Sequence, residues 1–204
     1  MKSSKHAILA AAAMILLFLT GACSNKPFLA VQYQSPSSTD TLAGKEVSQV
    51  ITDDRETKIF LSESAKKSLR EFNETYSLVV LKEDGSGDLL GIYEIEALFD
   101  EIFKQRLTSL GIKVSPPANQ SEYEFEIKLT EFKLDLVERK WVVNMSYQAN
   151  LSKNRRILAM ESVSGSAERL KVMGQSDAEK LIGELLTDMV NKLNLVKLFQ
   201  QAQR

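Results

Sequence analysis

Apolar and polar side chains alternate most regularly over residues 123–163, and this pattern predicts three consecutive β-strands. Apolar residues take every second position over 123–129 and again over 141–151, with turn-forming residues between the runs. Strict alternation is typical of strands with one face buried and one face in water, so we predict an antiparallel meander. After Thr130 the phase of the alternation slips by one residue, which indicates a β-bulge.

Two longer segments have the spacing of helices. Apolar side chains recur every three or four residues over 92–110, where Gly111 follows as a stop, and again over 178–193. The residues Ser176 to Glu179 have the form of a capping box at the start of the second helix. Each apolar stripe is wide enough to cover a sheet, so we interpret both as core faces rather than as a lipid groove.

Shorter apolar runs precede these segments and predict additional strands over 28–33, 45–53 and 78–81. The predicted fold class is therefore α+β, in a two-layer arrangement with two long helices packed on one face of a largely antiparallel β-sheet. We expect residues 28–204 to form a single α+β domain of this kind.

The N-terminus has the pattern of a bacterial export signal. Lys2 and Lys5 precede an unbroken apolar run over residues 7–19, which is shorter than the about 20 residues needed to span a bilayer. Small residues then lead directly into Cys23, the only cysteine of the chain. We predict that residues 1–22 are a cleaved lipoprotein signal and that Cys23 carries acyl chains, palmitate among them. A plain secretory signal and an uncleaved anchor helix are the alternatives.

The predicted lipoprotein has a short tether and a predicted location. Residues 23–27 are the lipidated N-terminus and a polar spacer. Ser24 stands where an Asp tends to retain Gram-negative lipoproteins at the inner membrane, so we expect an outer-membrane anchor that faces the periplasm.

Composition excludes several kinds of chemistry. The only histidine, His6, belongs to the predicted signal, and Cys23 would be acylated, so the remaining chain offers no imidazole and no free thiol. Ser-His-Asp and Cys-His catalysis and His- or Cys-ligated zinc are therefore excluded. With 26 basic and 27 acidic residues, the chain has no basic patch for nucleic acid. We predict no enzyme activity, no cofactor and no metal.

Clustered charges follow the strand at 45–53. Asp53 and Asp54 are paired carboxylates that could bind a cation or act as acid and base, although a charged turn is the commoner role of such a cluster. Asp54, Arg55 and Thr57 are the candidate interaction residues of this segment.

The chain resembles the YajG-like family of uncharacterised outer-membrane lipoproteins. The resemblance rests on the signal that ends in Cys23, the Asp54-Arg55-x-Thr57 segment, the helix that closes at Leu110-Gly111, the segment 181–190 and the tail 198–204. It implies a location and an architecture, but no activity, because none is established for the family.

These features favour a non-catalytic envelope lipoprotein that acts as an adaptor or assembly partner of an envelope complex, held to the membrane by its acyl chains. The two-layer arrangement is also similar to auxiliary lipoproteins of lipid transporters, an analogy of fold alone. One alternative is a binder of lipid or cell-wall glycan, which predicts an open apolar groove between sheet and helices. Another is a hydrolase that uses Asp53 and Asp54, which requires both side chains to line a cleft.

Overall fold

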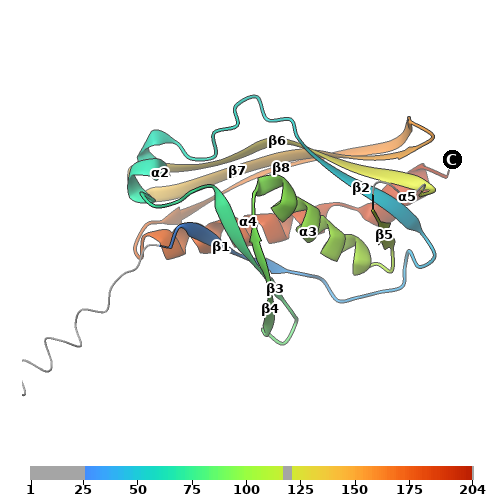
Figure 1. The fold of residues 1–204 in the computed structure, drawn as a ribbon, viewed down its shortest axis with the longest axis horizontal. Coiled ribbons are helices and arrows are strands. Elements are labelled where there is room, and N and C mark those ends of the chain that lie inside the picture. Colours follow the sequence, from blue (N-terminus) through green and yellow to red (C-terminus); the bar gives the residue numbers. More distant parts are fainter. Residues whose placement is uncertain (1–25, 117–120, 204) are drawn as a thin grey trace, which may run out of the picture.

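The computed structural model describes residues 26–116 and 121–203 and confirms the α+β class (Figure 1). The strands are β1 (Phe28–Gln34), β2 (Glu46–Asp53), β3 (Thr75–Leu81), β4 (Gly87–Tyr93), β5 (Lys113–Ser115), β6 (Tyr123–Val137), β7 (Lys140–Lys153) and β8 (Arg156–Leu170). The helices are α2 (Glu63–Ser68), α3 (Ile95–Thr108), α4 (Gln175–Lys192) and α5 (Leu195–Gln201).

The larger sheet has five strands in the order β5-β2-β6-β7-β8. The predicted meander is confirmed, because β6, β7 and β8 pair antiparallel in sequence order. The predicted bulge is confirmed too, as a shift of register between Leu129 and Glu131. Strands β2 and β5 extend this sheet with parallel pairs, which makes it mixed.

A second sheet has three strands in the order β1-β3-β4, with β1 parallel to β3. The prediction of one largely antiparallel sheet is therefore wrong, and the expected two-layer arrangement is not confirmed. Strand β4 escaped prediction because its apolar residues do not alternate with polar ones, and none of its seven side chains is buried. It also moves the start of α3 from the predicted Ile92 to Ile95.

The two long helices, α3 and α4, pack on one face of the five-stranded sheet (Figure 1). From α3, the Phe103 ring lies 6.1 Å from that of Phe125 on β6 and 5.3 Å from that of Tyr147 on β7. The Tyr147 hydroxyl donates to the Met189 carbonyl of α4 at 2.9 Å. The small sheet contacts both helices, through β1 on α4 and through β3 and β4 on α3.

The predicted capping box at the start of α4 is wrong. The helix is capped by Gly174, and no side chain bonds to its first amides. Ser176 lies inside the first turn, and the Glu179 carboxylate instead accepts the backbone N–H of Ala30 in β1 at 3.0 Å. A contact with a distant strand has replaced the local cap.

Candidate functional site

The charged segment after β2 forms a structural ion pair. Arg55 donates from Nε and Nη2 to the two carboxylate oxygens of Asp53, each at 2.8 Å, and from Nη1 to the Phe132 carbonyl at 3.1 Å. The side chains of Arg55 and Asp53 are only 5% and 11% exposed. The hydrogen bonds from Arg55 lower the pKa of the Asp53 carboxyl to about 2. This pair fixes the end of β2 to the middle of β6.

The three predicted interaction residues do not come together in one site. Arg55 is buried, whereas Asp54 and Thr57 are exposed. Two hollows of about 270 and 310 Å³ border Arg55, and neither Asp53 nor Asp54 lines them. The geometry that the hydrolase hypothesis requires, with both carboxylates in one cleft, is therefore absent at this segment. Cys23 lies outside the described residues, so its acylation stays a prediction.

The space between the helices and the five-stranded sheet is filled with side chains. Phe99, Phe103 and Phe125 are fully buried there, and the side chains of Leu181 and Ile182 are at most 2% exposed. The alternative of a lipid or glycan binder predicted an open apolar groove between sheet and helices. These side chains fill the space against the five-stranded sheet, whereas a hollow of about 480 Å³ borders α4 and the edge of β1.

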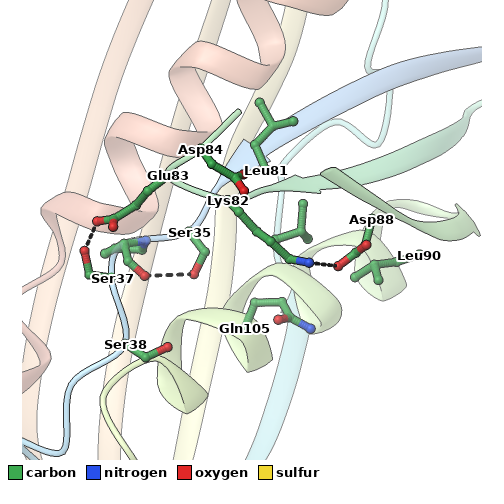
Figure 2. A pocket seen from close by; sticks show the side chains of 12 residues that line it. Ser35, Ser37, Ser38, Leu81, Lys82, Glu83, Asp84, Asp88, Leu90 and Gln105 are labelled. Atoms are coloured by element: carbon green, nitrogen blue, oxygen red, sulfur yellow. Dashed lines mark hydrogen bonds and ion pairs between the residues drawn. The ribbon is translucent and has the colours of Figure 1, made fainter. Parts of the chain in front are cut away.

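A further hollow lies outside the core, where the β3–β4 hairpin faces the loop after β1 (Figure 2). It measures about 570 Å³ and has a largely polar rim. Lys82 pairs with Asp88 at 3.0 Å, and the Ser37 hydroxyl donates to Glu83. These charges are exposed and satisfy one another, so the hollow offers little binding energy to a ligand.

A feature that sequence reasoning missed is the way α4 covers the free edge of β1. Gln175 donates to the Phe28 carbonyl at 2.9 Å, Glu179 accepts from Ala30, and Thr187 accepts from the Gln34 N–H at 3.1 Å. Asn191 donates to the Gln34 carbonyl at 3.0 Å.

These helix residues stand four positions apart, with Gly183 at the centre of the row. A Cβ at Gly183 would lie 2.7 Å from the Gln32 carbonyl oxygen, so only glycine allows the strand to come this close. The available signal was a row of polar residues with a four-residue spacing, beside the apolar stripe of this amphipathic helix.

The outer edge of β8 has no such cover. Strand β8 is the last of the five-stranded sheet and pairs only with β7. Among residues 26–116 and 121–203, no side chain or backbone group outside β7 forms a hydrogen bond with the backbone of β8. A row of free N–H and C=O groups on a 15-residue strand can pair with a strand of another chain.

Neither models of known protein families nor curated proteins match the sequence. A solved Xanthomonas campestris protein of the family DUF330 has a similar structure, with a TM-score of 0.53 and 13% identity. The similarity covers 88% of this chain and all of that one, and it concerns the fold alone. The resemblance to the YajG-like family therefore stays a prediction.

Bacterial lipoproteins are among the more distantly similar structures. Lipoprotein GNA1162 from Neisseria meningitidis has a TM-score of 0.38 and 13% identity, over 72% of this chain and 96% of its own. Rare lipoprotein B from Shewanella oneidensis has a TM-score of 0.39 and 8% identity, over 78% and 98%.

Two further findings concern only the described part of the chain. None of its helices is both long and apolar enough to cross a bilayer. No three acidic, histidine or cysteine side chains within it converge on a possible metal position.

Proposed function

We propose that the chain is a non-catalytic lipoprotein of the outer membrane, anchored at Cys23 and facing the periplasm, that acts as an adaptor for another envelope protein. The open edge of β8 is the observation that carries this proposal. A protein that works by chemistry needs reactive groups in a cleft, whereas an adaptor needs an accessible surface with a defined geometry.

The sequence of β8 supports binding rather than protection of the edge. Edge strands that must stay unpaired usually contain charges, prolines or bulges. From Ala159 to Ala167, β8 has neither proline nor bulge, and Glu161 is its only charged residue. Ser162, Ser164 and Ser166 are exposed and small, so they leave room for an incoming strand.

The partner that fits this edge is an extended segment of another protein. Such a segment adds a strand to the sheet, gains affinity from main-chain hydrogen bonds and gains specificity from alternate side chains. The edge of β1 is less suited to this, because α4 packs against it and already bonds to its backbone at Phe28, Ala30 and Gln34. We therefore place the partner at β8 of the five-stranded sheet and not at the edge of β1.

Crosslinking in living cells tests the adaptor role. A photoreactive amino acid replaces Ser164 on β8 and, as a matched control, the exposed Gln34 on the covered edge of β1. We expect one dominant envelope protein attached at position 164 and none at position 34, identified by mass spectrometry. A product that contains only this chain, only lipid or only glycan would contradict the proposal.

The anchor is tested separately. We expect Cys23→Ser to abolish acylation and signal cleavage, as measured by the mass of the N-terminal peptide and by the distribution of the protein between membrane and soluble fractions. A variant that is still cleaved and released would show that the lipoprotein assignment is wrong.

A further inference from the structure

The loop between β8 and α4 has an unusual combination of order and exposure. Val172 and Met173 are 76% and 73% exposed, the highest values for large apolar side chains in the described residues. Exposed apolar side chains that are contiguous, as these two neighbours are, can form part of a contact surface for a protein or a membrane.

The backbone of this loop is held in place by its neighbours. The Asp177 carboxylate accepts the N–H of Val172 at 2.7 Å and also that of Met173. The Trp141 indole donates to the Gly174 carbonyl at 3.0 Å, and the Lys171 N–H donates to the Arg139 carbonyl at 2.7 Å. The exposure of the two apolar side chains is therefore a property of a fixed loop and not of a loose one.

The loop lies where the chain leads toward the predicted acylation site. Gln175, two residues after Met173, bonds to the carbonyl of Phe28, the first residue of β1. Figure 1 shows the start of β1 beside the start of α4, at the end of the domain opposite the C-terminus. From Phe28 back to Cys23 is five residues, which span at most about 18 Å when fully extended.

Basic side chains flank the apolar pair. Lys171 and Arg139 stand in the two connections at this end of the five-stranded sheet, and Lys26 precedes β1. The acidic residue in these two connections is Glu138. The nearby Asp177, in α4, accepts a hydrogen bond from the backbone of the loop. Each basic side chain near an anionic membrane strengthens association about fivefold.

We propose that this loop, with Val172 and Met173 at its tip, rests on the phospholipid surface in which the acyl chains of Cys23 are embedded. The inference rests on the proposed lipid anchor. Apolar side chains at such a surface reach about 5–10 Å into the boundary between headgroups and acyl chains. A second contact of this kind fixes the orientation of a domain that a short tether alone would leave free to turn.

The orientation has a consequence for the adaptor role. Strand β8 ends at Leu170 beside the proposed membrane contact and begins at Arg156 at the opposite end of the domain. Its open edge would thus run away from the membrane into the periplasm, where a partner can reach the span from Ala159 to Ala167.

Site-specific fluorescence tests the contact on the full acylated protein. A cysteine replaces Val172, Met173 or, as the control, Ile157, which is 54% exposed at the far end of β8. Each variant is purified from membranes, labelled with an environment-sensitive dye and reconstituted into vesicles of phosphatidylethanolamine and phosphatidylglycerol.

We expect blue-shifted emission and about twofold quenching by nitroxide lipid at positions 172 and 173, and neither at position 157, because only the loop reaches the boundary region. Water-like emission at all three positions would overturn the proposed contact while leaving the anchor intact. An unacylated Cys23 takes up a second dye, which mass spectrometry counts, and that result would overturn the anchor and the contact together. Protection at 172 and 173 that appears only with a bound envelope protein would show that a protein, and not lipid, covers the loop.

Discussion

Strands β1 and β8 are both edge strands, but the edge of β1 is covered by a helix and the edge of β8 is open. The edge of β1 bonds to side chains from α4 at Phe28, Ala30 and Gln34, whereas the edge of β8 bonds to nothing else in the described residues. Open edges are a risk for aggregation, and proteins usually protect them. The fold closes the first edge with α4 and leaves the second edge open, and it is at this second edge that we propose a partner adds a strand.

The largest effect is expected where α4 touches β1. Gly183→Leu forces a side chain against the backbone of Gln32 and should lower the free energy of unfolding by about 3 kcal/mol, because helix and strand must separate. Lys180→Leu places the same side chain at an exposed position of α4 and should change stability by less than about 0.5 kcal/mol. Urea unfolding measures both. Equal effects would show that α4 does not close this edge.

The Asp53–Arg55 ion pair extends the comparison to side chains that stabilise the fold and do not form a binding site. Because the folded-state pKa of Asp53 is depressed to about 2, its contribution is present above the unfolded pKa of about 4 and is lost as the pH falls from 4 through 2. Asp53→Asn should therefore cost about 2 kcal/mol of stability at pH 7 and flatten this part of the pH profile.

The neighbouring Asp54 provides the control for that prediction. It is exposed, so Asp54→Asn should change stability by less than about 0.5 kcal/mol at any pH. Chemical unfolding between pH 2 and pH 7 compares the two variants. A pH profile that depends on Asp54 and not on Asp53 would refute the structural role of the pair.

A smaller loss is expected from opening the β1 edge at one bond. Glu179→Ala leaves the N–H of Ala30 without its acceptor and should cost about 1–2 kcal/mol. Glu184→Ala on the same helix removes only a surface pair with Arg169 and should cost less than about 1 kcal/mol. Hydrogen exchange at Ala30 gives a local readout, and unchanged protection in the Glu179 variant would contradict the assigned contact.

The smallest effect on stability is expected at the open edge. Ser164→Lys should leave the free energy of unfolding within about 0.5 kcal/mol, because the side chain is exposed. It should reduce capture of the partner about tenfold, because a charge in the edge disfavours an added strand. Gln34→Lys is the control at the covered edge and should leave capture unchanged. Equal capture by both variants would place the partner elsewhere.

Local patterns in the sequence predicted the parts of the fold that depend on local contacts. Alternation located the meander and its bulge at Leu129, and the apolar spacing located α3 and α4. The pairing of β1 with β3 joins residues 47 positions apart, as in Phe28 with Thr75, and no periodicity encodes that choice. The apolar residues of strand β4 do not alternate with polar ones, so no period-two pattern marks it as a strand.

The candidate site was harder to predict than the fold. The sequence indicated Asp54, Arg55 and Thr57 because they belong to a cluster of charged residues. In the structure Arg55 is buried, whereas Asp54 and Thr57 are exposed. An open strand edge is made of backbone groups, which every residue possesses. Only the order of the strands shows which of those groups are left free.

Hydrogen exchange along β8 tests the central claim most directly. In the purified protein, the outward-facing amides of β8 should exchange within seconds, while those of Ala30 and Gln34 on β1 stay protected. In the complex isolated from membranes, the same β8 amides should become protected over the span that binds the partner. Amides of β8 that are protected in the isolated protein, or that remain fast in the complex, would contradict the account.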